Sequence, residues 1–466
     1  MYMNQEEEEE ENNLSLSKFE SMLKTNKVFF FDSEEFEDIV LHYMDTGKVN
    51  LAKKALKLGL EQHPKSTGLK LVHVEILIYD DKIDQAEKIL NEIALLEPTN
   101  EEVFIQRANI CSKRDQHEKA IEHLNEALLI TEDEADIYSM IGMEYLFMDN
   151  LELAKDNFIL CLENDDEDYS ALYNVVYCFD FLDQNQEAID FLEKFIDENP
   201  YSEVAWHQLG RQFYALKNYE KAVWAFDYAC LIDEDFLGAF LEKAKSLERL
   251  KMYQEAIDCY NITLELDDPT SFAYLRIGKC YEKLGNNEQA LNFYLKTVHE
   301  DPLLDKAWLT ITDFYIKQKN YQKSLYYINK AIAIDGENPL YWRRYANINQ
   351  YLNFFEEAEE GYRKAFENGD IELDNFLCWS DVLYVLGEVA AAFEILNQAK
   401  ELYENESEIQ YRMVGLYYNI EEEFNAIEAL NLALLTNFEK NYILKDLFPH
   451  VWECKTVQKI IKNHNI

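Results

Sequence analysis

The chain has 466 residues, 90 acidic and 44 basic, which gives a formal net charge of −46. A charge of this size repels nucleic acids and anionic membrane surfaces at long range, so we expect neither as a partner. The acidic start of the sequence and its short apolar runs, far below the roughly 20 residues of a membrane helix, predict neither a signal peptide nor a membrane span.

The first 32 residues are expected to form a tail and a cap. Residues 1–13 contain six consecutive carboxylates, from Glu6 to Glu11, a run that is typical of a disordered, solvated tail. In residues 14–32, apolar side chains including Phe19 and Met22 share one face of a short predicted helix. We expect this helix to cap the repeated body that follows.

A small residue returns every 34 positions through residues 33–440, with no insertion or deletion. A fixed period of this length indicates a solenoid, in which each repeat buries its apolar face only against its neighbours. Apolar residues spaced i, i+3, i+4 and i+7 predict two amphipathic helices per repeat, and the small residue lets the second helix approach the first closely. The series consists of Ala52, Ala86, Ala120, Ala154, Ala188, Ala222, Ala256, Ala290, Ser324, Ala358, Ala392 and Ala426.

A short turn is predicted between the two helices of each repeat. It contains a residue that tolerates the left-handed backbone conformation, where a helix can end. Because the period is unbroken, the twelve repeats are predicted to form one continuous body. The predicted turn residues include Gly47, Asp81, Asp149, Asp183, Gly285, Asn353 and Gly387.

The residues within the repeats resemble a known family. The sixth repeat reads Trp206, Leu209, Gly210, Phe213, Ala222, Phe226 and Ala229, and the eighth reads Tyr274, Ile277, Gly278, Tyr281, Ala290, Tyr294 and Pro302. This pattern is similar to that of the tetratricopeptide repeat family. The resemblance implies an all-α fold, a right-handed superhelical α-solenoid of stacked antiparallel helix pairs whose first helices line the inner surface. It also implies a non-enzymatic scaffold that binds a partner protein or an extended peptide in a concave groove.

Residues 441–466 are expected to form C-terminal capping helices. Leu444, Phe448 and Val451 supply apolar positions of an incomplete further repeat, and lysines such as Lys455 and Lys459 supply a polar outer face. A terminal repeat with one polar face keeps a solenoid soluble.

The candidate binding residues lie at repeat positions 2, 5, 9, 12 and 13, which point into the groove in the architecture that the resemblance implies. In the four repeats from 203 to 338 these positions hold seven basic and three acidic residues. Arg211, Lys245 and Lys279 share position 9 of consecutive repeats and predict a row. The candidate groove consists of Tyr173, Tyr177, His207, Arg211, Tyr214, Lys245, Arg249, Lys279, Lys283 and Lys317, with further aromatic residues at Phe272, Tyr351, Tyr384, Tyr411 and Tyr418.

Aromatic and cationic side chains on a concave surface favour a protein or peptide partner with acidic groups or a C-terminal carboxylate. An ordinary helix surface with charge pairs worth about 0.2–0.5 kcal/mol each is the alternative interpretation of the same residues. Two other functions stay open. One is single-stranded nucleic-acid binding through the basic and aromatic side chains, and the other is a purely architectural oligomer joined through the convex face or the ends.

Some members of the family clamp a C-terminal carboxylate with Lys, Asn, Asn, Lys and Arg spread over three repeats. Arg343 and Asn347 resemble the first two elements, and Arg412 resembles the last. Cys378 and Glu408 depart from the other two elements. We therefore assign no clamp.

The sequence contains no pattern typical of an enzyme, a cofactor site or a metal site. It has no phosphate-binding glycine loop and no HExxH or other zinc spacing. The acidic stretch Glu163–Asp168 lacks the glycine and the final glutamate of a calcium loop. Eight cysteines without a CxxC pair fit a reducing compartment, so we expect a cytoplasmic protein with no cofactor and no metal.

Overall fold

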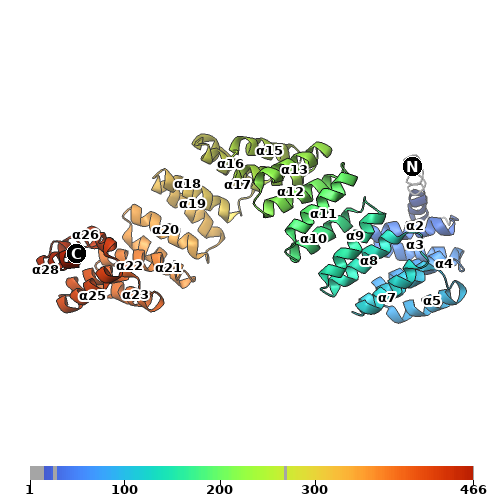
Figure 1. Ribbon diagram of the computed structural model, residues 1–466, viewed down its shortest axis with the longest axis horizontal. Coiled ribbons are helices and arrows are strands. Elements are labelled where there is room, and N and C mark those ends of the chain that lie inside the picture. The colour runs from blue at the N-terminus through green and yellow to red at the C-terminus, as the bar shows by residue number, and fades with distance from the viewer. Residues whose placement is uncertain (1–14, 25–28, 267–269, 465–466) are drawn as a thin grey trace. The chain divides into compact units, whose positions relative to one another are not determined.

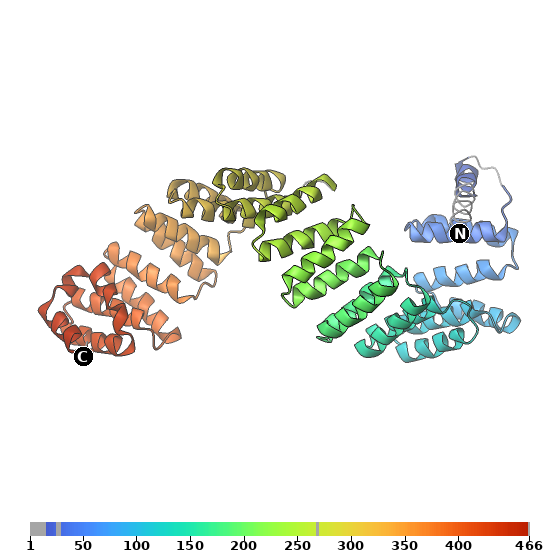
Figure 2. The ribbon, with the colours of Figure 1, turned by 45° about the horizontal axis from the view of Figure 1, so that its top comes forward.

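The computed structural model describes residues 15–24, 29–266 and 270–464. Every regular element among these residues is a helix, and consecutive helices pack as antiparallel pairs (Figure 1 and Figure 2), so the predicted all-α fold of stacked helix pairs is confirmed. The structure divides into two compact units, Met1–Glu242 and Lys243–Ile466, and the continuity of the twelve repeats over residues 33–440 stays a prediction. Contacts in a solenoid join only neighbouring repeats, so an unbroken sequence period does not require a single compact unit.

The first unit begins with a helix over residues 15–24. It continues through six helix pairs, and α14 runs across the boundary between the units. These helices are α2 (Ser33–Asp45), α3 (Val49–Gln62), α4 (Thr67–Tyr79), α5 (Ile83–Leu96), α6 (Glu101–Lys113), α7 (His117–Leu128), α8 (Glu134–Phe147), α9 (Leu151–Asn164), α10 (Tyr169–Phe181), α11 (Asn185–Glu198), α12 (Glu203–Ala215), α13 (Tyr219–Ile232) and α14 (Leu237–Arg249).

The second unit starts at Lys243 within α14 and ends in short helices. Its elements after α14 are α15 (Tyr253–Leu266), α16 (Ser271–Lys283), α17 (Asn287–Glu300), α18 (Asp305–Lys317), α19 (Tyr321–Ile334), α20 (Pro339–Tyr351), α21 (Phe355–Glu367), α22 (Leu373–Val385), α23 (Val389–Leu402), α24 (Ser407–Asn419), α25 (Glu423–Thr436), the 3-10 helix η1 (Phe438–Asn441), α26 (Tyr442–Leu447), α27 (Pro449–Trp452) and α28 (Lys455–His464).

Each first helix ends at a residue in the left-handed conformation, and this residue also recurs every 34 positions. Its φ lies between 54° at Asp115 and 82° at Gly387. The chain then turns back: the amide of Asn218, for example, donates to the carbonyl of Phe213 at 2.9 Å, a bond that closes a helix end around a left-handed residue. The seven predicted turn residues are confirmed within a series of twelve: Gly47, Asp81, Asp115, Asp149, Asp183, Lys217, Lys251, Gly285, Lys319, Asn353, Gly387 and Glu421.

The small-residue series lies in the core of both units. Each of its twelve members, Ser324 included, has no exposed surface, as close helix packing predicts. Glycine has the same role in some first helices. A Cβ atom added to Gly210 would lie 2.5 Å from the ring of Phe226, and one added to Gly278 would lie 2.6 Å from the ring of Tyr294. The repeat geometry therefore follows from the size of these side chains.

Additional helices cover both ends of the repeated body. Near the N-terminus, the ring of Phe19 packs edge-on against Phe31 and Phe36 in the core of the first repeat. At the C-terminus, Phe448 and Val457 are buried in one cluster with α24 and α25. The predicted acidic tail, residues 1–13, lies outside the described residues. The functional division into tail, caps and repeats stays a prediction.

Candidate functional site

Ion pairs join the first helices of consecutive repeats in the second unit. Arg276 of α16 contacts Glu248 of α14 twice, with Nε to Oε1 at 2.8 Å and Nη2 to Oε2 at 2.7 Å. One repeat later, Lys317 of α18 contacts Glu282 of α16 at 2.5 Å. These links show that α14, α16 and α18 share one surface of the second unit.

A cavity of about 450 Å³, here called the basic pocket, opens on this surface. Five cationic and three carboxylate side chains line it, so the lining has a formal charge of +2. It brings together four of the predicted groove residues, Arg249, Lys279, Lys283 and Lys317. The full lining is Glu248, Arg249, Tyr253, Arg276, Lys279, Glu282, Lys283, Tyr294, Thr310, Asp313 and Lys317.

Tyrosines from the second helices hold two of the carboxylates in the basic pocket. Tyr260 donates its hydroxyl to Glu248 at 2.7 Å, and Tyr294, exactly one repeat length of 34 residues later, donates to Glu282 at 2.6 Å. Burial would raise the pKa of Glu282, but the hydrogen bonds from Lys317 and Tyr294 outweigh it and hold that pKa below its ordinary value. Both carboxylates thus accept hydrogen bonds from within the protein. The remaining basic side chains of the lining supply the positive charge that faces the cavity.

Lys279 and Lys283 carry that positive charge. Among the residues that the structure describes, neither ammonium forms an ion pair with a carboxylate. Lys279 is half-buried, and burial, followed by the nearby charge of Arg276, lowers its pKa. An ammonium that has lost part of its hydration gains more from an incoming anion than one in open water. The pocket is therefore arranged to accept a negatively charged group.

The predicted row of Arg211, Lys245 and Lys279 is divided between the units. In the first unit, Arg211 donates from Nη1 to Gln208 Oε1 at 3.0 Å. In the second, Lys245 lies outside the lining of the basic pocket, with Nζ 5.6 Å from the ring centre of Phe272. Only Lys279 of the three lines the pocket.

The predicted aromatic residues of the first unit have different surroundings. Tyr173 and Tyr177 are exposed on α10, and the ring of Tyr177 lies 4.5 Å from that of Phe181. Tyr214 packs edge-on against Tyr219 at 5.3 Å. Within this unit, the predicted residues of α10 are thus available at the surface.

His207 and Tyr411 correct the prediction for repeat position 5. His207 is only 8% exposed, because its ring packs 4.9 Å from that of Phe236 and 5.6 Å from that of Phe226. Tyr411 is fully buried and donates its hydroxyl to the carbonyl of Asn437 at 2.9 Å. Both side chains are thus covered by residues from outside their own helices, and neither lines an open groove.

Arg276 is the one basic residue of the pocket lining that the predicted groove lacks. It occupies repeat position 6, which the predicted groove positions left out. Arg344 and Arg412 stand at the same position of later repeats, and each pairs with an acidic residue of the preceding first helix: Arg344 with Asp313 at 3.3 Å, and Arg412 with Asp381 at 2.7 Å. The sequence signal for these ion pairs is an arginine that recurs at repeat position 6, with an acidic residue about one repeat before it.

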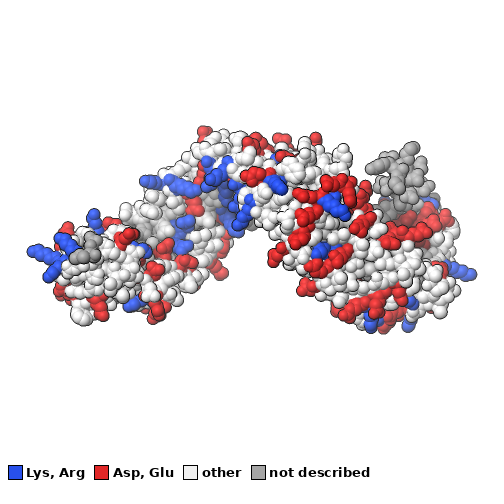
Figure 3. Space-filling view, viewed as in Figure 1, with Lys and Arg blue, Asp and Glu red and all other residues white. Residues whose placement is uncertain are grey.

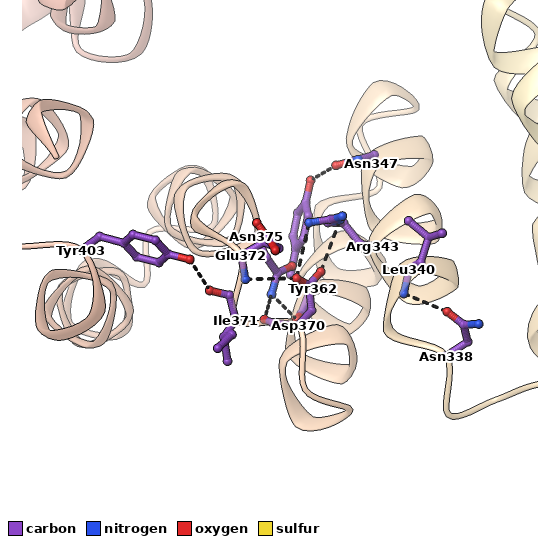
Figure 4. Close-up of polar contacts among 10 residues, drawn as sticks. All are labelled: Asn338, Leu340, Arg343, Asn347, Tyr362, Asp370, Ile371, Glu372, Asn375 and Tyr403. Atoms are coloured by element: carbon purple, nitrogen blue, oxygen red, sulfur yellow. Dashed lines mark hydrogen bonds and ion pairs between the residues drawn. The ribbon is translucent and has the colours of Figure 1, made fainter. Parts of the chain in front are cut away.

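The carboxylate clamp stays unassigned, and the contacts in the second unit agree with that decision. Figure 4 shows Arg343 directed at Asp370 and the hydroxyl of Tyr362 donating to Asn347. The Arg343–Asp370 contact is 3.3 Å and the Tyr362–Asn347 bond is 2.6 Å. Arg412 is 8% exposed and holds Asp381 through two hydrogen bonds. The residues that resemble clamp elements are therefore engaged inside the protein.

The described residues contain no group of three or more His, Cys, Asp or Glu side chains that could hold a metal ion. None of the helices that they form is long and apolar enough to cross a membrane. All eight cysteines are free thiols.

Comparison with known proteins identifies the repeats. Sequence profiles of the tetratricopeptide repeat match residues 135–168, 170–202 and 272–303, and each matched segment coincides with one helix pair of the 34-residue series. These three segments are tetratricopeptide repeats. The matched segments lie in both units, in phase with the small-residue series that runs through the remaining repeats.

Two curated relatives match part of the chain. It is 25% identical over 150 residues to anaphase-promoting complex subunit 3 of Schizosaccharomyces pombe. The aligned segment covers 32% of this chain and 23% of that protein. It is 29% identical over 103 residues to the BBSome complex member BBS4 of Xenopus tropicalis. Here the aligned segment covers 22% of this chain and 20% of that protein. The chain thus matches about a fifth of the length of either relative.

A solved tetratricopeptide repeat structure also matches. It is the C-terminal part of a TPR repeat-containing protein from Cytophaga hutchinsonii, with a TM-score of 0.45 and 14% identity. The match covers 55% of this chain and 98% of that one.

Proposed function

We propose that this chain is a non-enzymatic protein-interaction scaffold, and that its second unit binds an acidic segment of a partner protein in the basic pocket. The observation that carries the proposal is a concave site where two carboxylates are held by internal hydrogen bonds while Lys279 and Lys283 face the cavity. Acidic side chains and a C-terminal carboxylate offer the same chemistry to such a site, namely an anionic oxygen that accepts charge-assisted hydrogen bonds.

The charge distribution supports local rather than long-range attraction. Residues 1–242 hold 54 acidic and 20 basic residues, whereas residues 243–349 hold 14 acidic and 15 basic residues. At physiological ionic strength the screening length is about 8 Å, so an anion at the pocket senses the adjacent lysines more than the distant carboxylates. The negative charge elsewhere disfavours binding of the same anion at other places on the chain.

The curated relatives support a role within an assembly. Both are named as components of complexes, the anaphase-promoting complex and the BBSome. Because the chain matches only about a fifth of each, we infer from them a scaffold or adaptor role and no particular partner. We also infer a cytoplasmic location, which the eight free thiols support.

Fluorescence anisotropy with a defined peptide tests the proposal. The ligand is a short fluorescein-labelled peptide of Glu, Ser and Leu with a free C-terminal carboxylate, titrated with the full chain. Lys279→Glu with Lys283→Glu is expected to weaken binding about 100-fold, since it removes two charge-assisted hydrogen bonds of about 1.5 kcal/mol each. A peptide with an amidated C-terminus separates recognition of the terminal carboxylate from recognition of the acidic side chains.

The matched control places the same charge change on second helices. Lys330→Glu with Lys400→Glu alters exposed residues of α19 and α23, away from the basic pocket, and is expected to keep the wild-type affinity. Equal weakening by both double variants would show that only net charge matters and would contradict the proposal. A labelled single-stranded oligonucleotide that bound with the same dependence on Lys279 and Lys283 would favour the nucleic-acid alternative.

A further inference from the structure

The first unit exposes a strip of large apolar side chains on two first helices. Tyr173, Tyr177 and Phe181 follow one another at intervals of four on α10 and are 42%, 45% and 65% exposed. Met143 and Phe147 on α8 are 37% and 59% exposed. We call these five residues the aromatic strip. Neighbouring exposed side chains of this size form a candidate interaction surface.

The aromatic strip occupies the repeat positions that form the basic pocket in the second unit. Tyr177 and Met143 stand at position 9, the position of Lys279. Phe181 and Phe147 stand at position 13, the position of Lys283. The amide of Asn174 on α10 lies 3.9 Å from the sulfur of Met143, so α8 and α10 are neighbours along this surface. The strip therefore lies on one surface of the first unit, formed by the first helices α8 and α10.

Acidic residues dominate the region around the aromatic strip. Residues 134–198 contain 18 acidic residues and two lysines. One of the two, Lys155, is 9% exposed and is held by Glu152 and Gln184. Figure 3 shows acidic side chains gathered around α9 to α11. The cations of this region thus neutralise little of its surface charge.

The carboxylates at the N-terminal ends of α8 and α10 repel one another. Burial, followed by the charges of Asp133, Asp168 and Asp165, raises the pKa of Asp136 above its ordinary value. These carboxylates lie at the opposite ends of α8 and α10 from Phe147 and Phe181, so they add to the negative charge of the region and not to the immediate surroundings of the strip.

We propose that the aromatic strip is a second docking surface, and that its ligand is an extended peptide segment with Arg or Lys side chains next to apolar ones. Exposed Tyr and Phe rings bind a guanidinium or ammonium group over their faces, and their flat surfaces also bury apolar side chains. The surrounding carboxylates select the positive sign and repel an acidic segment. The surface differs from the basic pocket in unit, in side-chain chemistry and in the charge of its ligand.

Titration with a cationic peptide tests this proposal. The probe is a short fluorescein-labelled peptide of Arg, Ser and Leu, and its control has Glu in place of Arg. The full chain is expected to bind the Arg peptide and not the Glu peptide at the aromatic strip. Tyr177→Ser with Phe181→Ser is expected to weaken binding of the Arg peptide by about tenfold or more, because two ring faces are lost. Unchanged affinity in this variant would overturn the proposal.

A matched variant separates the aromatic strip from general apolar exposure. Phe424→Ser with Leu435→Ser removes two side chains of α25 that are 80% and 74% exposed, and it is expected to leave the affinity for the Arg peptide unchanged. Phe181→Ser alone keeps the test valid if the double variant folds poorly, because the Phe181 side chain is mostly exposed.

Photo-crosslinking locates the bound peptide. With p-benzoylphenylalanine in place of one Leu of the Arg peptide, mass spectrometry is expected to find adducts on α8 and α10. Adducts spread over the acidic second helices would show attraction by charge alone and would overturn the proposal.

Discussion

The first helices of the two units carry different side chains at the same repeat positions. Position 9 is Tyr177 in the first unit and Lys279 in the second, and position 13 is Phe181 and Lys283. The core beneath them is unchanged, since Ala188 and Ala290 are both fully buried. Positions that pack between helices are constrained by volume, whereas positions at the surface are not. The buried positions of the repeat are thus alike in the two units, whereas positions 9 and 13 of the first helices differ in charge and polarity between them.

The largest expected effect tests how the first helices are held together. In the second unit Asp381 forms two hydrogen bonds to the buried Arg412, and in the first unit Asp180 accepts one from Gln212 at 2.7 Å. Asp381→Ala is expected to lower the free energy of unfolding by about 3–5 kcal/mol, because the buried Arg412 loses two hydrogen bonds to a carboxylate and keeps only its longer ion pair with Glu408 at 3.6 Å. Asp180→Ala is expected to cost about 1–2 kcal/mol, because only one hydrogen bond to a neutral partner is lost.

Urea unfolding followed by hydrogen exchange measures both costs and assigns each to its unit. The control for the larger one is Asp381→Leu with Arg412→Met, which replaces the pair by apolar side chains and should recover most of the loss. An equal loss in free energy of unfolding for Asp381→Ala and Asp180→Ala would contradict the expected difference between the two contacts.

The next effect tests whether the scaffold is the same in both units. Ala222→Leu in the first unit and Ala290→Leu in the second each overpack a contact between a first and a second helix, at an expected cost of about 1–3 kcal/mol. The two free energies of unfolding should agree within about 0.5 kcal/mol, the usual precision of additive comparisons. A tolerated substitution in only one unit would show that the units pack differently.

The smallest expected effect is electrostatic and has opposite signs in the two units. Hydrogen bonds lower the pKa of Glu282, so its carboxylate stabilises the folded state above its unfolded pKa, and this stability is lost as the pH falls through the lower folded value. Burial and neighbouring carboxylates raise the pKa of Asp136, so its charge destabilises the folded state at neutral pH and the penalty disappears on acidification.

Two substitutions measure these signs. At about pH 7, Glu282→Gln should lower the free energy of unfolding and Asp136→Asn should raise it, each by less than about 1 kcal/mol because both sites are partly solvated. Near pH 3.5, below the ordinary pKa of both groups, the two differences should shrink. Shifts of the same sign at neutral pH would contradict the contrast between the two regions.

Much of the fold could be predicted because a repeat multiplies weak signals. The small-residue series and the turn residues such as Asp81 and Gly285 each return with the same period, so the helix pairs and their boundaries follow from the sequence. The division into two units does not follow from the period, because the same period runs through both units.

The candidate site could be predicted only in part. Lys279 and Lys283 were found from their repeat positions, whereas the burial of His207 depends on Phe236, a side chain from outside its own helix. The carboxylate of Glu248 likewise accepts hydrogen bonds from Tyr260 and Arg276, which come from two other helices. Contacts between helices decide which charged side chains remain available, and a helical pattern does not contain them.

The most direct test of the account crosses two ligands with two variants of the full chain. The acidic peptide and the Arg peptide are each titrated with Lys279→Glu/Lys283→Glu and with Tyr177→Ser/Phe181→Ser. The account predicts that the first variant loses the acidic peptide and keeps the Arg peptide, and that the second does the reverse. Loss of both peptides in one variant, or of neither peptide in both variants, would contradict two surfaces of opposite specificity.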